Sequence, residues 1–171
     1  MRCGHQENRV AERIRSGWPC SATQRPMTRL GKLPARYSFF LNPYPDLRFT
    51  SCPQCGAKMR QRKLPLVIHV EPHYFLALNK TCKYCPHCDL LLAHKDILED
   101  LLARMFAERA PEIIGNDYLV VGTMDRSDWQ EGLHAGVPLA DMLRSLHDFK
   151  RVVTFKPALT WGPENITRQR T

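Results

Sequence analysis

The stretch from Cys52 to Cys88 decides the fold, because a cysteine motif occurs near each of its ends. The first copy is Cys-Pro-Gln-Cys-Gly (residues 52–56), and the second is Cys-Pro-His-Cys-Asp (residues 85–89). In each copy two cysteines stand three residues apart on a predicted tight turn, so both sulfur atoms reach one ion. Two such turns supply four thiolates, the ligand set of a closed tetrahedral Zn²⁺ site. The predicted metal ligands are therefore Cys52, Cys55, Cys85 and Cys88.

A fifth cysteine in this stretch leaves the pairing open. Cys82 lies three residues before Cys85, so these two residues form an alternative second pair. Only Cys85 and Cys88 repeat the Cys-Pro-x-Cys pattern, which favours Cys88 as the fourth ligand. Cys82 is then a buried strand thiol, an alternative ligand or a reactive thiol beside the site.

Four thiolates around one Zn²⁺ leave no coordination position for water or substrate. The pattern therefore predicts one structural zinc ion and a non-catalytic protein. The alternative is a thiol-disulfide redox enzyme, because a Cys-x-x-Cys motif lowers the pKa of a thiol. Such enzymes need a βαβ context, whereas this motif occurs twice in a strand-rich stretch. No Gly-rich phosphate loop, nucleophile elbow or small-molecule site is evident.

The two cysteine turns resemble the knuckles of the zinc-ribbon class. The longer phrase Leu-Asn-Lys-Thr-Cys-Lys-Tyr-Cys-Pro-His-Cys-Asp-Leu-Leu (residues 78–91) also resembles a bacterial zinc-ribbon family of unknown function. The resemblance covers residues 50–93 and implies metal ligands only. Zinc-ribbon proteins include nucleic-acid-binding modules and protein-interaction adaptors, and a shared fold does not select between them.

Hydrophobic patterning predicts an α+β protein, in which a small zinc-ribbon β-module is followed by an amphipathic helix and a C-terminal β-α-α-β region. Proline at the start and apolar residues at helical spacing predict a helix from Pro138 to Phe149, with His147 and Asp148 at its solvated end. The other expected elements are strands at 64–70, 73–78, 89–93, 117–123 and 151–156 and helices at 96–106 and 127–133.

Charge and composition suggest the domain limits. Residues 1–36 contain eight Lys or Arg and two Glu, so they carry +6 of the net charge of +8. We predict a basic disordered arm over 1–36, with Met27 as an alternative initiator. The zinc ribbon and its aromatic lead-in then span 37–93, the helix and β-α-α-β region span 94–160, and a flexible tail spans 161–171.

Alternating cations follow the first cysteine turn. Lys58, Arg60 and Arg62 share one face of a predicted strand, about 6.6 Å apart, which is close to the spacing of successive phosphates. They are therefore candidate nucleic-acid contacts, with a solvated sheet face as the plainer interpretation. The expected partner is nucleic acid or another protein. Clustered cysteines and the lack of a long apolar run predict a cytoplasmic protein without a membrane partner.

Overall fold

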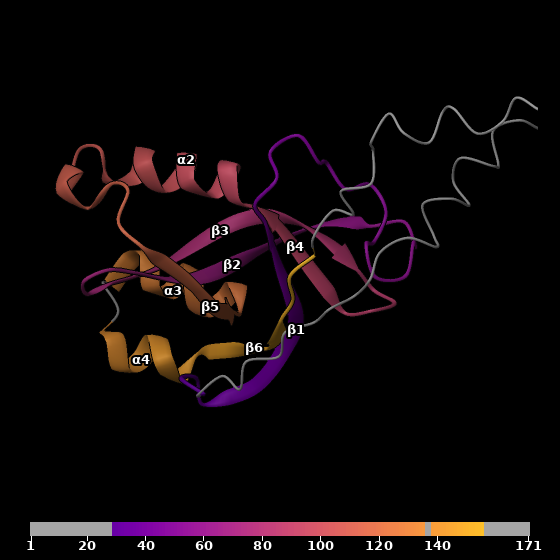
Figure 1. The fold of residues 1–171 in the computed structure, drawn as a ribbon. Coiled ribbons are helices and arrows are strands. Elements are labelled where there is room, and N and C mark those ends of the chain that lie inside the picture. The colour runs from indigo at the N-terminus through magenta and orange to yellow at the C-terminus, as the bar shows by residue number, and fades with distance from the viewer. Residues whose placement is uncertain (1–28, 136–137, 156–171) are drawn as a thin grey trace, which may run out of the picture.

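Six β-strands form the body of the structure, which is a computed structural model describing residues 29–135 and 138–155 (Figure 1). Its elements are β1 (Leu33–Asn42), β2 (Arg60–Val70), β3 (Tyr74–Cys85), β4 (Leu90–His94), α2 (Lys95–Phe106), η1 (Pro111–Ile113), β5 (Tyr118–Met124), α3 (Arg126–Ala135), α4 (Leu139–Arg144) and β6 (Leu146–Val152). The strands close into a barrel in the order β1-β4-β3-β2-β5-β6. β1 pairs in parallel with β4 and β6, and the other pairings are antiparallel.

The barrel overturns the predicted α+β layout of a zinc-ribbon module, a helix and a separate β-α-α-β region. β5 pairs with β2 and β6 pairs with β1, so the C-terminal strands complete the same barrel as the N-terminal ones. The cause is β1, which begins at Leu33, before the predicted lead-in, and fills the place between β4 and β6. Within the predicted arm and tail, residues 1–28 and 161–171 lie outside the described residues.

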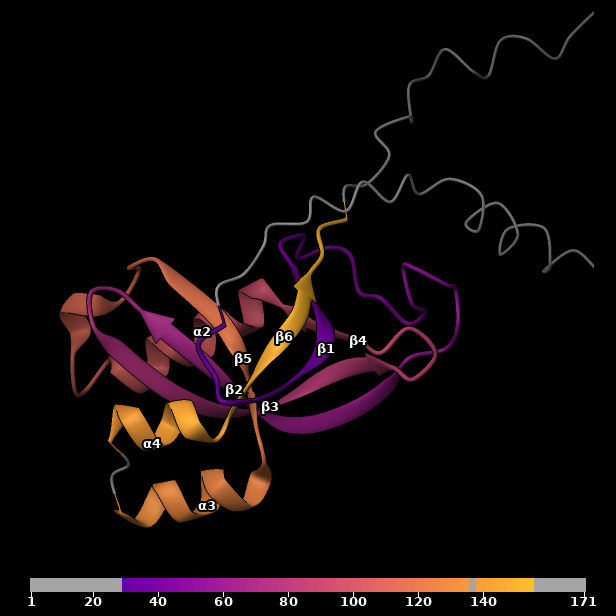
Figure 2. The same cartoon turned by 90° about the horizontal axis from the view of Figure 1, so that it is seen from below.

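Apolar residues on both faces of the strands create three separate clusters. Inside the barrel, residues from all six strands pack together, and the rings of Phe39 and Phe149 stack with centroids 4.3 Å apart. The next residue along β1, Phe40, points to the opposite face, where it packs with the cysteine turns. A third cluster lies beneath α3 and α4, which lie side by side on the barrel away from α2 (Figure 2).

The helix predicted at 96–106 is confirmed, with one difference at its start. α2 begins at Lys95, and Leu98 and Leu102 are buried against the barrel core. Asp96 does not cap it, because the N-cap residue is His94. Instead, the Asp96 carboxylate pairs with the Arg48 guanidinium at 2.6 Å. α2 therefore closes the barrel, while its first turn is tied to the loop after β1.

The helix predicted from Pro138 to Phe149 is wrong in its second half. α4 ends at Arg144, and the chain continues as β6 from Leu146. His147 and Asp148 are each 3% exposed, so they do not form a solvated helix end. The helical spacing of the leucines gave a wrong prediction here. Residues 146–149 lie in a strand that is buried on both faces, so they lack the alternation of buried and exposed residues that marks a half-exposed strand.

Gly122 allows β5 and β6 to approach each other closely. A Cβ atom at this position would lie 2.2 Å from the carbonyl oxygen of His147. The register between β2 and β5 also shifts at the neighbouring Val67–Ile68 step, as is common at a bulge.

We therefore expect Gly122→Ala to destabilise the protein by about 1–3 kcal/mol, because the two strands must separate. Chemical denaturation checks this, with Gly115→Ala as a comparison: Gly115 has open space around a Cβ but a φ of +90°, so its cost arises only from the backbone. An unchanged stability of Gly122→Ala would contradict the close approach.

Candidate metal centre

The first cysteine turn lies in the loop between β1 and β2. The Cys52 amide donates to the Ala57 carbonyl, and the Gly56 amide donates to the Cys52 carbonyl, both at 2.8 Å. Gly56 has a φ of +73°, which glycine adopts at little cost. A further bond, from the Met59 amide to the Thr50 carbonyl, joins the two sides of the turn just before β2. The turn thus holds two thiols together and delivers the chain into β2.

The second cysteine turn connects β3 to β4 and has the same backbone shape. Asp89 follows Cys88 as Gly56 follows the first pair, and its φ is +52°. The Asp89 carbonyl accepts a hydrogen bond from the Ser38 amide at 2.8 Å. Its carboxylate accepts one from the Tyr84 hydroxyl at 3.1 Å and one from the Lys150 ammonium at 2.7 Å. These contacts offset the cost of a left-handed non-glycine residue.

The two turns bring four thiols into one place. Ligand atoms of Cys52, Cys55, Cys85 and Cys88 all lie within 4.8 Å of one another, and the Sγ atoms of Cys55 and Cys85 are 3.6 Å apart. Four sulfurs at about 2.3 Å from a tetrahedral Zn²⁺ would be about 3.8 Å apart, whereas a disulfide needs about 2.05 Å. The cluster is therefore compatible with one bound metal ion, and zinc is a plausible one.

The acidities of these thiols are unequal. Burial raises the pKa of Cys52 to about 11, and burial with the neighbouring sulfurs raises the pKa of Cys88 further. Burial also acts to raise the pKa of Cys55, but the Ala57 backbone amide and the other three thiols outweigh it and lower the pKa to about 7. The Cys55 thiolate is thus favoured, whereas the thiolates of Cys52 and Cys88 are opposed, and a bound divalent cation would offset that cost.

The metal cluster rests on its own small apolar core outside the barrel. Cys52 and Cys85 are buried, Cys88 is half-buried and Cys55 is exposed. The surrounding apolar side chains include Met59 from the start of β2, together with Phe40, Leu90, Leu92, Val153 and Phe155. The site therefore links the loop after β1, the β3–β4 turn and the segment after β6.

Cys82 lies apart from this cluster. It is 3% exposed and packs inside the barrel with Leu64 and Leu91. Burial raises the pKa of its thiol to about 12. Of the three roles considered from the sequence, the geometry corresponds to a buried strand thiol.

The predicted cations lie at the exposed entrance to β2. Lys58, Arg60 and Arg62 are all exposed. The Arg62 guanidinium lies over two aromatic rings, 5.4 Å from the Tyr37 centroid and 5.1 Å from the Tyr84 centroid. Tyr37 has a φ of +57°, an uncommon conformation for a bulky residue.

A buried polar group at the β1–β6 junction could not be found from the sequence. The Asp148 carboxylate accepts backbone hydrogen bonds from Leu30 and Gly31 at 3.3 and 2.9 Å. His147 Nδ1 lies 2.8 Å from the Pro34 carbonyl, which makes Nδ1 the protonated donor. These bonds fix the start of β1 on β6, and only the barrel topology shows why two polar residues are buried there.

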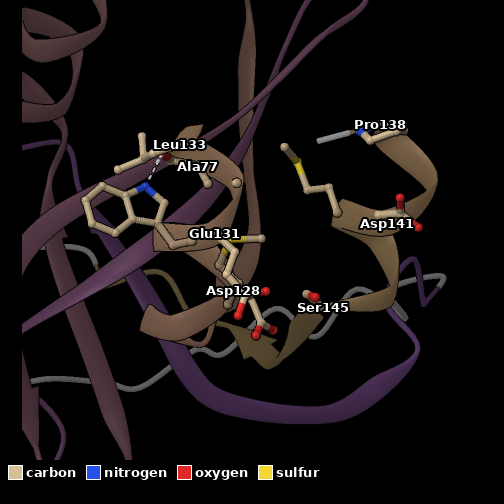
Figure 3. A pocket seen from close by; sticks show the side chains of 11 residues that line it. Ala77, Asp128, Glu131, Leu133, Pro138, Asp141 and Ser145 are labelled. Carbon is tan, nitrogen blue, oxygen red and sulfur yellow. Dashed lines mark hydrogen bonds between the residues drawn. The ribbon is translucent and has the colours of Figure 1, made fainter. Parts of the chain in front are cut away.

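A pocket of about 680 Å³ separates α3 from α4 (Figure 3). Asp128 and Glu131 lie on its α3 side, and Asp141 and Ser145 lie on its α4 side. The Trp129 indole lines it and donates to the Ala77 carbonyl at 3.1 Å. Its carboxylates do not form a metal site. Among residues 29–135 and 138–155, only the four-cysteine group brings ligand atoms close enough together to hold one ion.

Comparisons of the chain with protein-family models, with curated proteins and with solved structures found no match. Within the described residues, every helix is too short or too polar to cross a membrane.

Proposed function

We propose that this protein is a non-catalytic binding module that contains one structural Zn²⁺ and binds single-stranded nucleic acid in a reducing compartment such as the cytoplasm. The observation that carries the proposal is the Arg62 guanidinium held over two tyrosine rings, beside the turn that gathers the four thiols. In this proposal the metal has a role in binding, because it holds in place the start of β2, which carries the cations.

The thiol cluster supports the structural role of the metal. Cys52, Cys55, Cys85 and Cys88 supply all four positions of a tetrahedral site, so bound Zn²⁺ would have no free position for a substrate. It would cross-link the loop after β1 to the β3–β4 turn, which the pairing of β2 with β3 places side by side. The redox alternative would rest on the exposed Cys55 thiol, whose pKa is lowered to about 7.

The basic entrance to β2 supports nucleic acid as the partner. Residues 58–63 contain four cations and no acid. Cations at alternate strand positions follow a phosphate backbone, and the two half-buried tyrosines, which pack against the barrel core, fix the Arg62 guanidinium in place. Tyr37 keeps an uncommon backbone conformation to place its ring against Tyr84 and Arg62, with the two tyrosine centroids 5.7 Å apart. Such local strain is often found at binding sites.

The first cysteine turn positions this basic segment. Ser51 and Lys58 form an isolated antiparallel bridge, and Met59 is buried in the metal cluster's apolar core. Lys58 and Arg60 flank Met59, so removing the metal would free the segment that presents them. A loss of nucleic-acid affinity on zinc removal is therefore part of the proposal.

The triple variant Lys58→Gln, Arg60→Gln, Arg62→Gln tests the partner. It should weaken binding to a single-stranded oligonucleotide and reduce the slope of log K against log salt by about 2, since each lost phosphate contact removes about 0.7. Fluorescence anisotropy across a salt series measures both quantities on the zinc-loaded full chain.

The control removes three cations from other surfaces, Lys95→Gln, Arg104→Gln and Arg144→Gln. Each of these residues is exposed and forms an ion pair on its own helix. An equal effect of the two triple variants would show only a general charge effect. No oligonucleotide binding by the wild-type protein would reject the proposal and leave a protein partner as the remaining interpretation.

A further inference from the structure

A second pocket lies between β3, β4, the first turn of α2 and the loop residues 48–50. Its volume is about 290 Å³, which suits a ligand of few heavy atoms. The polar residues in its wall include Arg48, Thr50, Gln61, Lys80, Lys83 and His94. This wall is rich in hydrogen-bond donors and contains no carboxylate side chain.

Lys80 is the unusual member of this wall. The residue is only 6% exposed, but its Nζ is not among the fully buried polar atoms that lack a hydrogen-bond partner, so the stem is buried while the ammonium keeps some accessible surface. Within the described residues, no ion pair or side-chain hydrogen bond engages its ammonium group. Burial lowers the pKa of Lys80, and Coulombic interactions with Cys82 and Asp96 act in the opposite direction without outweighing it. The Cys82 thiol also lines the pocket but stays neutral, because burial raises its pKa to about 12.

The charges around the pocket add to this imbalance. Lys83 lines the pocket, as does Arg48, and the nearby carboxylate of Asp96 is already paired with Arg48 at 2.6 Å. Burial lowers the pKa of His94, as do the cations Arg48, Lys80 and Lys83, whereas the Asp96 carboxylate acts to raise it. The first turn of the twelve-residue helix α2 adds the positive end of its dipole.

His94 contributes a donor because its tautomer is fixed. The Asn42 side-chain oxygen accepts the Tyr44 amide at 3.0 Å, and its side-chain nitrogen donates to the Leu47 carbonyl at 2.8 Å. The same nitrogen also lies 3.1 Å from the Tyr44 carbonyl and 3.0 Å from His94 Nδ1, and because it is a donor it favours an unprotonated Nδ1. The His94 proton is then on Nε2, so this pocket residue keeps a free donor.

We propose that this pocket binds a tetrahedral oxyanion of the phosphate class, with Lys80 as its counter-charge and Lys83 and His94 as further donors. The anion supplies the negative charge that the pocket wall lacks. It is free phosphate or the phosphoryl group of a small molecule, since either fits a volume of about 290 Å³. The site is independent of the basic entrance to β2, so it stands even if nucleic acid does not bind there.

The test adds inorganic phosphate to the zinc-loaded full chain at constant ionic strength, with chloride as the balancing anion. Phosphate is expected to raise the unfolding temperature with increasing concentration, and calorimetric titration to give a saturable binding curve. Lys80→Met, which keeps the length of the side chain and removes the charge, should weaken phosphate binding by about tenfold or more. Lys63→Met is the matched control, because Lys63 is exposed on the neighbouring strand, and it should change binding by less than about twofold.

Zinc content and circular dichroism of Lys80→Met show whether it folds, and Lys83→Met gives a second reading that does not disturb the buried position. Equal phosphate binding by wild type, Lys80→Met and Lys83→Met would overturn the proposal. So would a rise in unfolding temperature that chloride alone reproduces. A parallel titration with glycerol phosphate identifies the source of the anion: tighter binding than phosphate indicates a phosphorylated small molecule, and weaker binding indicates the free ion.

Discussion

A Cys88→Ala variant is expected to lose its Zn²⁺, whereas Cys82→Ala is expected to retain one ion per chain. Cys88 belongs to the group of four thiols within 4.8 Å, and Cys82 packs inside the barrel. Removing one of four thiolates breaks a closed site whose binding is worth about 10–16 kcal/mol in small zinc modules. Loss of the metal should therefore lower the unfolding temperature far more than the small cavity left by Cys82→Ala.

Native mass spectrometry of the full chain under reducing conditions measures the zinc content of both variants. Zinc retained by Cys88→Ala but lost by Cys82→Ala would reassign the fourth ligand. A metal-free wild type with a disulfide between Cys55 and Cys85 would reject the structural zinc and return attention to thiol-disulfide chemistry.

Zinc removal should also unfold one part of the protein before the rest. The metal cluster's apolar core lies outside the barrel and contains Phe40 and Met59, whereas Phe39 lies in the barrel core. Zinc removal is therefore expected to expose backbone amides first in residues 43–59 and at the β3–β4 turn, with the barrel core protected for longer. Hydrogen exchange with and without a chelator checks this order. Acidification should act like the chelator, because protons compete with Zn²⁺ for the thiolates.

Phe149→Ala is expected to destabilise the protein by about 3–5 kcal/mol, the usual cost of removing a buried phenylalanine. Phe149 is 3% exposed in the barrel core, and its ring stacks on Phe39 with an interplanar angle of 4°. At the end of a solvated helix, the same change would cost less than about 1 kcal/mol. Equilibrium unfolding in denaturant therefore distinguishes the barrel from the α+β layout that the sequence pattern favours.

Val152→Ala on the same strand is the control. Val152 is 37% exposed, so its truncation should lower the free energy of unfolding only slightly. A double-mutant cycle with Phe39→Ala isolates the stacking contact, which is expected to couple the two residues by about 0.5–1.5 kcal/mol. Equal costs for Phe149→Ala and Val152→Ala would place Phe149 outside a core.

The four-cysteine cluster was predictable because its signal is local. Cys52 and Cys55 are set by one turn, Cys85 and Cys88 by another, and β2 and β3 pair over their full length to bring those turns together. The long apolar run in β2 also indicated a strand correctly. Even Pro65 fits, because it lies before the residues of β2 that pair with β5, so its missing amide costs no ladder bond on that side.

The barrel was not predictable from the same reasoning, because its closure depends on parallel pairing between distant segments. β1 has no turn linking it to β4 or β6, and its residues 33–36 stand in a stretch whose composition indicates an arm. The leucines of α4 and β6 share a helical spacing, so no local rule separates them at Ser145. The pocket around Lys80 was hidden for the same reason, since its wall combines β3, β4, α2 and the loop after β1.

The pairing of Leu33 with His147 has a consequence for the order in which a newly made chain folds. A ribosome completes both cysteine turns while β6 is still unsynthesised, so a metal-bound β2–β3 hairpin is able to form early. The edge of β1 that pairs with β6 then stays unpaired until β6 has been synthesised. Distant pairings of this kind close slowly and leave an edge available to other chains. The time until ring closure would thus influence how much newly made protein escapes aggregation.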